Sequence, residues 1–181
     1  MVRDFLKKIK SIVFPKYKVI GDKSNLFLSK DVRFRGNVIF DLRLGGVIKV
    51  GENTVLHEGV ILESHGGFIE IGNNCSVNPY CVLYGHGGLK IGNYVRIATH
   101  SVFIPSNHNY IDKNVFIHFQ GSTNLGIVIE DDVWIGCGSR ILDGVSIGRG
   151  VVIGAGSVVS KSLESYGVYV GVPAKKINSR V

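Results

Sequence analysis

The sequence predicts an all-β protein, a parallel β-helix wound from six-residue repeats. An aliphatic residue returns at every sixth position in the C-terminal half, at Ile129, Ile135, Ile141, Ile147, Ile153 and Val159. A small or β-branched residue stands four positions after most of these, at Val133, Ser139, Val145, Val151 and Ser157. Neither the helical period of about 3.6 nor the strand period of about 2 yields a strict period of six. A triangular coil does, because each unit forms one short strand and one turn, and three units close a coil of about 18 residues.

The same period runs through the first half of the chain. It passes through Val50, Leu56 and Leu62, then Ile71, Val77 and Leu83, then Ile91, Ile97 and Phe103, with a weaker version at Val32, Val38 and Leu44. We therefore predict a β-helix domain over residues 26–165, with these side chains stacked in a central column. Cys75 and Cys81 stand at the four-later position, so we expect them to be small buried hydrophobic residues.

Residues 1–25 precede the repeats and are predicted to form a short helix and a lead-in. Five apolar residues lie near helical spacing with lysines between them, at Phe5, Leu6, Ile9, Ile12 and Val13, and Pro15 ends the pattern. We expect this amphipathic helix to cap the open end of the coil stack. A weak contact with an anionic membrane surface is the alternative, because of the lysines.

Two further segments leave the repeat. Residues 104–126 interrupt it and are predicted to form a loop that projects from one corner, and long loops on rigid scaffolds tend to carry function. Residues 166–181 contain Gly171-Val172-Pro173 and are predicted to form a tail that folds back along the outside.

Charge and composition limit the function classes. The formal net charge is +7, and residues 1–18 alone carry six basic residues and one acidic residue, so the rest is close to neutral and gives little support for nucleic-acid binding. No run approaches the roughly 18 apolar residues of a membrane span, and no signal peptide is expected. Three cysteines at no metal or redox spacing favour a reducing compartment, so a cytoplasmic location is expected.

Two features carry a resemblance to a known family. One is the run of Ile-Gly repeats; the other reads NHNY at 107–110, IHFQG at 117–121 and GIVIEDDVWIG at 126–136. Together they resemble the hexapeptide-repeat acyltransferases, in the branch of maltose, galactoside and nodulation-type O-acetyltransferases, and most closely the surface-polysaccharide O-acetyltransferases. The resemblance implies left-handed coils, acetyl-CoA as co-substrate without a metal, and a homotrimer with active sites between subunits.

The resemblance also implies a catalytic base. In that branch a histidine opens the loop sixteen residues after an Ile-Gly glycine, and that count from Gly92 leads to His108. An asparagine that holds the acceptor lies fourteen residues before the same glycine, which is the position of Asn78. A neutral imidazole can take the proton of a sugar hydroxyl as the oxygen attacks the thioester carbonyl. The transfer is direct, so Cys137 is not required as a nucleophile.

The remaining site residues follow from the same motifs. His118 is expected to contact acceptor or coenzyme, and Trp134 to lie beside the coenzyme at its acceptor end. The groove for pantetheine and phosphates is expected to involve Ala155, Ser160 and Lys161, with Lys175 and Lys176 near the nucleotide phosphate. The tail departs from the family at Asn178, where related enzymes often carry an arginine.

The expected activity is acetyl-CoA-dependent O-acetylation of a sugar hydroxyl, in a cell-surface polysaccharide or its precursor. N-acetylation of an amino nucleotide sugar is the main alternative, because the mechanism is shared. A zinc carbonic anhydrase-like enzyme is less favoured: it needs two histidines five residues apart, whereas the pairs 57/65 and 100/108 are each eight apart. A non-enzymatic scaffold is the third alternative.

Overall fold

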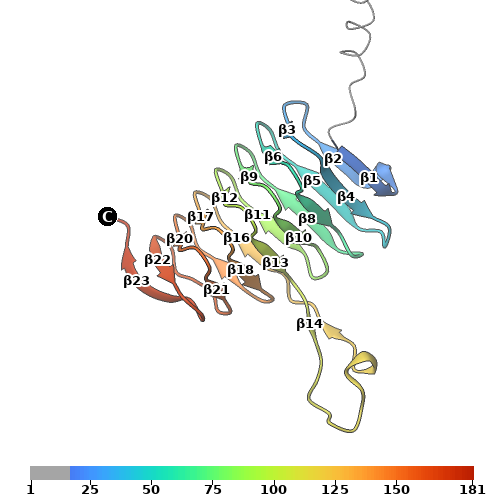
Figure 1. Cartoon of the computed structure of the whole chain (residues 1–181), viewed down its shortest axis with the longest axis vertical. Coiled ribbons are helices and arrows are strands. Elements are labelled where there is room, and N and C mark those ends of the chain that lie inside the picture. Colours follow the sequence, from blue (N-terminus) through green and yellow to red (C-terminus); the bar gives the residue numbers. More distant parts are fainter. Residues whose placement is uncertain (1–16) are drawn as a thin grey trace, which may run out of the picture.

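The computed structural model describes residues 17–181, and the helix predicted over residues 2–14 lies outside them. The described chain forms a triangular solenoid with three parallel sheets as its faces (Figure 1). Sheet A contains β1 (Tyr17–Gly21), β4 (Val38–Leu42), β7 (Ile61–Glu63), β10 (Val82–Tyr84), β13 (Val102–Ile104), β18 (Arg140–Leu142) and β21 (Val158–Val159). Sheet B contains β2 (Leu26–Leu28), β5 (Val47–Val50), β8 (Phe68–Ile71), β11 (Leu89–Ile91), β16 (Ile127–Ile129) and β19 (Ser146–Ile147).

Sheet C contains β3 (Arg33–Arg35), β6 (Val55–His57), β9 (Ser76–Val77), β12 (Arg96–Ile97), β17 (Trp134–Ile135), β20 (Val152–Ile153), β22 (Gly167–Val170) and β23 (Lys175–Ser179). A 3-10 turn, η1 (Lys23–Asn25), precedes β2. The chain passes from sheet A to B to C and back to A, and we name the three edges the AB, BC and CA corners. This all-β architecture confirms the predicted fold class, and its winding is consistent with a left-handed β-helix.

The core is the predicted column of aliphatic side chains. The repeat positions stack in register, with Leu62 beside Leu83 and Ile141 beside Val159, and all four are fully buried. Cys75 and Cys81 are also buried, as predicted. The predicted phase of the weak first repeat is wrong, because Leu44 is 71% exposed. The residues that pair with Val50, Leu56 and Leu62 are Leu28, Phe34 and Phe40, where two aromatic rings take the place of aliphatic side chains.

The solenoid is longer than the repeat suggests at both ends. β1 pairs with β4 over residues 17–21, ahead of the predicted start at residue 26. β22 pairs in parallel with β20 and so continues sheet C beyond residue 165, while only β23 turns back antiparallel on β22. None of the helical segments in residues 17–181 is long and apolar enough to cross a membrane.

The corners turn at residues with left-handed backbone. On the CA corner these are Gly36, Gly59, Tyr80 and His100 in the N-terminal coils, where Glu58 and the Tyr80 ring cover the two glycines, then Gly138 and Gly156 (φ 68° and 70°) in the C-terminal coils. Non-glycine residues seldom adopt this conformation. The CA corner therefore changes along its length, from side chains that project outward to bare glycine backbone.

Candidate active site

A long loop leaves the AB corner between β13 and β16, where the sequence predicts it (Figure 1). Its stem is a two-stranded antiparallel ribbon of β14 (Asn107–His108) and β15 (Ser122–Thr123). The stem is held to the solenoid at both ends: Gly87 N–H donates to the Pro105 carbonyl at 3.1 Å, and the Asp143 carboxylate accepts from Gly126 N–H at 2.8 Å. These anchors place the stem at a defined height on the corner.

Polar side chains of the motif brace the loop from inside. The Gln120 amide donates to the carbonyls of Asp112 and Val115 at 2.8 and 2.7 Å. Asn109 donates to the Gln120 carbonyl at 3.0 Å and accepts from the Thr123 hydroxyl at 2.8 Å. These hydrogen bonds connect the two sides of the loop, which projects far from the solenoid.

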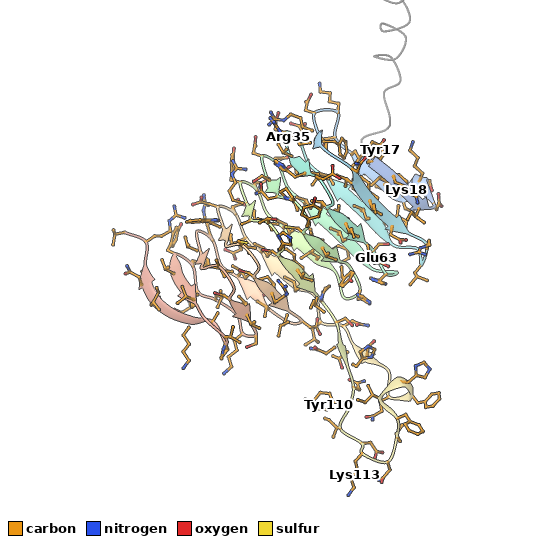
Figure 2. All side chains as sticks on the ribbon, in the orientation of Figure 1. Tyr17, Lys18, Arg35, Glu63, Tyr110 and Lys113 are labelled. Carbon is orange, nitrogen blue, oxygen red and sulfur yellow. The ribbon has the colours of Figure 1, made fainter. Side chains whose placement is uncertain are left out.

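His108, the predicted base, lies in the stem opposite Ser122. Its side chain is exposed and makes no hydrogen bond within residues 17–181, so both ring nitrogens can meet a substrate. His118 lies further out, in the 3-10 turn η2 (Ile117–Phe119), against the Phe119 ring at 4.8 Å. The outer loop, which includes the labelled Tyr110 and Lys113 in Figure 2, also exposes Ile111 and Phe116, at 91% and 80%.

The other predicted site residues divide between the two edges of sheet A. Ser160 and Lys161 follow β21 on the AB corner, the corner that carries His108, and both are exposed. Asn78 and Ala155 lie on the CA corner, across the width of sheet A. The Asn78 amide donates to the Ile97 carbonyl of the next coil at 2.8 Å.

Trp134 lies on the outer face of sheet C, one residue before the strand end that leads into the CA corner, and is 57% exposed. Lys175 and Lys176 lie on β23, and the Lys176 ammonium is 3.6 Å from the Glu164 carboxylate. Asn178 pairs with Val168 on β22. One chain therefore does not bring His108 together with Asn78, Trp134 or Ala155, because sheet A separates them.

The CA corner carries no large side chains in the C-terminal coils around Ala155. A Cβ added to Gly138 or Gly156 would meet no atom within 4 Å, and the residues beside these glycines, Cys137 and Ala155, are small and exposed. The N-terminal part of the same corner carries the rings of Tyr80 and His100, whose centroids are 5.4 Å apart and whose planes are tilted by 34°. A long, thin ligand can therefore approach the backbone only along the C-terminal part.

The three thiols differ in environment. The Cys75 and Cys81 thiols donate to the carbonyls of Gly92 and Ala98, each at 3.1 Å. Burial raises the pKa of Cys75 and raises the pKa of Cys81 to about 11. Cys137 is exposed on the CA corner. Only Cys137 is therefore placed to meet a ligand.

A histidine cluster at the AB corner is absent from the sequence-based predictions. The rings of His65 and His86 stack at 3.8 Å with an interplanar angle of 19°, and Tyr84 lies edge-on to both. The Glu63 carboxylate lies 3.3 Å from His65 Nε2. Burial, and next the charge of His65, lower the pKa of His86, so its ring is neutral at pH 7. The signal was available: the segment His-Gly-Gly recurs 21 residues apart, the same spacing as Leu62 and Leu83.

No group of three or more histidine, cysteine or acidic side chains within residues 17–181 is arranged to hold a metal ion. The three convergent histidines that a zinc carbonic anhydrase-like site needs are therefore not found within these residues.

Comparison with known sequences identifies the C-terminal repeats. Residues 126–161 match the model of the bacterial transferase hexapeptide (six repeats). A Schizosaccharomyces pombe protein named as an acetyltransferase is 41% identical over 91 residues, which are 49% of this chain and 42% of that protein. A chloramphenicol acetyltransferase of Klebsiella aerogenes is 49% identical over 53 residues, 29% of this chain and 25% of the relative. The matches thus span less than half the length of these curated relatives.

Solved structures match over nearly the whole chain. AntD, an N-acyltransferase from Bacillus cereus, was solved as a mutant with dTDP-4-amino-4,6-dideoxyglucose and coenzyme A; it superposes with a TM-score of 0.67 at 25% identity, covering 99% of this chain and 89% of AntD. A second Bacillus cereus structure, described as an acetyltransferase, gives a TM-score of 0.69 at 22% identity over 91% of this chain and 84% of that chain.

Proposed function

We propose that this protein is an acetyltransferase that uses acetyl-CoA. Residues 126–161 match the transferase hexapeptide repeat, and the fold is similar to that of AntD. The acceptor we propose is a hydroxyl group of a saccharide. One observation carries the proposal: an anchored stem holds an exposed histidine at the solenoid edge, and the coils that follow it offer a bare corner and exposed lysines.

The residues present fit the coenzyme. The backbone around Gly138 and Gly156 leaves room for the thin pantetheine arm, and the small side chain of Ala155 does not obstruct it. Lys161 and Lys175 supply positive charge at the C-terminal end, where the phosphates would lie. Bound acetyl-CoA supplies the acetyl group as an activated thioester.

His108 acts as general base in the proposed mechanism. Its neutral imidazole takes the proton of the acceptor hydroxyl while that oxygen forms a bond to the thioester carbonyl carbon. The imidazolium then returns the proton to the sulfur as the carbon–sulfur bond breaks, so the products are an acetyl ester and the free thiol. Backbone N–H groups of a neighbouring coil would stabilise the intermediate oxyanion.

We propose that a homotrimer completes the site. Sheet A carries a row of outward-facing, half-buried residues in register, of which all but one in β4 to β21 are aliphatic: Ile39, Ile61, Val82, Val102, Arg140 and Val158. The corresponding row of sheet B contains Lys49, Glu70 and Lys90. Packing of sheet A around a threefold axis would bring the AB corner of one subunit beside the CA corner of its neighbour. That arrangement would bring His108 of one subunit close to Asn78 and Ala155 of the neighbouring subunit.

Substitution of the base tests the proposal. His108→Ala is expected to lower kcat of acetyl transfer by about two to four orders of magnitude, with the Kd of acetyl-CoA unchanged. Ser122→Ala is the matched control, because Ser122 lies opposite His108 in the same stem, and it should keep normal kcat. Transfer at the wild-type rate by the His108→Ala protein would rule out His108 as the base.

N-transfer to an amino sugar is the second candidate. The likeness to AntD, which was solved with an amino-sugar nucleotide, favours it. An amine needs the same base to accept a proton, so the geometry serves both acceptors. Rates of acetyl-CoA turnover with matched sugar alcohols and amino sugars distinguish them, and a strong preference for amines would replace the hydroxyl proposal.

A further inference from the structure

One row of side chains follows the edge of sheet A along the AB corner. It is formed by the last outward-facing position of successive sheet A strands, and we call it the edge row: Asp41, Glu63, Tyr84, Ile104, Leu142 and Ser160. Asp41 pairs with Glu63, Glu63 with Tyr84, and Ile104 with Leu142. Figure 2 shows Glu63 on the edge of the solenoid from which the loop projects.

The chemistry of the edge row changes where the loop leaves it. On the C-terminal side Ile104 and Leu142 are aliphatic, which suits a pantetheine arm. On the N-terminal side all three side chains can form hydrogen bonds. Since the proposed function assigns the coenzyme to the C-terminal coils, the acceptor must reach His108 from the opposite direction, along the polar half of the row.

Side chains on the AB corner extend the polar surface formed by this half of the edge row. Arg43, His65 and His86 follow Asp41, Glu63 and Tyr84 by two residues in successive coils. Asp41, Arg43 and Glu63 line a small pocket with His65 and Leu44, of about 180 Å³. The cluster is therefore continuous from the first coils to the base of the loop, where Gly87 bonds to Pro105.

The cluster contains one permanently charged basic side chain, and it is paired with an acidic one. The Arg43 guanidinium lies 2.6 Å from the Asp41 carboxylate, and His65 lies 3.3 Å from Glu63. His65 forms an ion pair with Glu63 only when its ring is protonated, so the cluster has no excess positive charge to hold a phosphate or a carboxylate. What remains are hydrogen-bonding groups, which favours a neutral, hydroxyl-rich ligand.

The rings of the cluster give it flat surfaces. The stacked imidazoles and the edge-on Tyr84 ring lie next to the polar groups, and planar side chains with polar edges offer both an apolar face and hydrogen bonds. The Nδ1 atom of His86 is buried without a hydrogen-bond partner. Buried polar atoms of folded proteins nearly always have a partner, so a cluster that leaves one orphaned is poorly explained by stability alone.

We infer that Glu63, His65, Tyr84 and His86 form a subsite for the sugar ring of a neutral saccharide acceptor. The inference rests on the proposed function for the direction of approach. The carboxylate of Glu63 would accept hydrogen bonds from ring hydroxyls, and the ring of Tyr84 would pack on the apolar face of the sugar. The subsite would present one hydroxyl to His108 at the loop base.

A binding experiment on the full-length protein without coenzyme tests the subsite. The probes are the methyl glycosides of glucose, galactose, mannose and N-acetylglucosamine, and the observable is the NMR shift of each histidine ring. At least one glycoside is expected to move the His65 and His86 signals, with a shift that saturates as the glycoside concentration rises. If no glycoside moves them, the subsite is disproved.

Variants then separate contact from structure. Glu63→Gln and Tyr84→Leu should each weaken the binding of that glycoside, Glu63→Gln by about tenfold to a hundredfold, and raise its KM, with the KM of acetyl-CoA unchanged. The matched control is Glu70→Gln, since Glu70 lies in the same coil on sheet B in an exposed ion pair with Lys49 at 2.8 Å. Equal binding by the control and by both subsite variants would overturn the inference.

The two proposals fail separately. Glycoside binding is measured without acetyl-CoA, so it can be present even if His108→Ala leaves acetyl transfer unchanged. Conversely, transfer that depends on His108 together with unperturbed His65 and His86 signals would keep the proposed function and reject the subsite.

Discussion

At the residue scale, two half-buried imidazoles couple folding to pH. Burial lowers the pKa of His57 and His86 in the folded chain below the ordinary value of about 6.5. The unfolded chain binds protons at these histidines first, so the free energy of unfolding should fall as pH drops through about 6.5 and should be fully retained above it. Glu63 and Asp143 oppose the effect at His86, and His65 and His108 add to it.

Urea unfolding at pH 7.5 and 5.5 measures this coupling. His86→Gln should show a smaller loss of stability on acidification than the parent protein, because one of the two groups is gone. His118→Gln, in the exposed outer loop, is the control and should keep the full pH dependence. An unchanged pH dependence in His86→Gln would contradict the burial argument.

The cysteines give a second residue-scale prediction. At pH 8, a thiol of pKa about 11 is ionised in only about one molecule in a thousand, so Cys81 should react slowly in the native protein. Cys137 is exposed, and we expect one fast-reacting thiol per native chain in titration with Ellman's reagent. Acetyl-CoA, which has no free thiol to consume the reagent, should slow this reaction if Cys137 lines the groove.

The Cys137→Ser protein is the control for the titration and should lose the fast phase. Fast reaction of a second thiol in the native protein would show that the buried cysteines are accessible. Equal rates with and without saturating acetyl-CoA would place the coenzyme away from the CA corner.

At the element scale, the loop depends on one carboxylate. Asp143 accepts from Leu125 N–H at 2.9 Å and Gly126 N–H at 2.8 Å, where the loop returns to the solenoid. Asp143→Ala removes both hydrogen bonds and should cost about 1–3 kcal/mol in local stability. We expect faster amide exchange at Leu125 and Gly126, faster proteolysis within residues 106–124, and a lower kcat.

Asp112→Ala is the control for loop anchoring. Its carboxylate accepts only from Asn114 N–H, within the outer loop. That variant should leave exchange at Leu125 and Gly126 unchanged. Slow exchange at these two amides in Asp143→Ala would show that the loop is held by other contacts, such as the close approach at Gly87, where a Cβ would lie 2.6 Å from the Asn124 carbonyl carbon.

At the scale of the whole molecule, sheet A decides assembly. Val82→Glu places a charge in the middle of its aliphatic outer row without touching the core, because Val82 faces outward beside the buried Leu83. We expect the mass measured by light scattering to fall from that of three chains to that of one, because burying an unpaired charge is costly. Acetyl transfer should fall with it, because each proposed site needs two chains.

The control for assembly is Val128→Glu. Val128 faces outward on sheet B, is 44% exposed, and should tolerate the charge with the trimer intact. A parent protein that is monomeric yet active would contradict the shared site.

The period of six by itself determined the fold. Residues at the same repeat position in successive coils stack on one another, so Leu62, Leu83 and Phe103 form one column even though loops interrupt the repeat. It failed in the first coil, since aromatic Phe34 and Phe40 hid the true phase, and it missed the strands that extend the solenoid at both ends. The loop and the buried cysteines also followed from breaks and offsets in the same period, whereas His108 followed from the family resemblance.

Only the tertiary structure decided where the candidate residues lie relative to one another. Spacing along the chain placed Asn78 and His108 in one motif, but coil geometry puts them on opposite corners of sheet A, which a count of residues does not reveal. The stack of His65 on His86 likewise arises because 21 residues make one full turn of the solenoid there, so residues distant in sequence become neighbours. The corner that a residue occupies depends on every insertion before it in the chain, because each insertion shifts the following residues relative to the repeat. The three-dimensional structure is therefore needed to assign the corner.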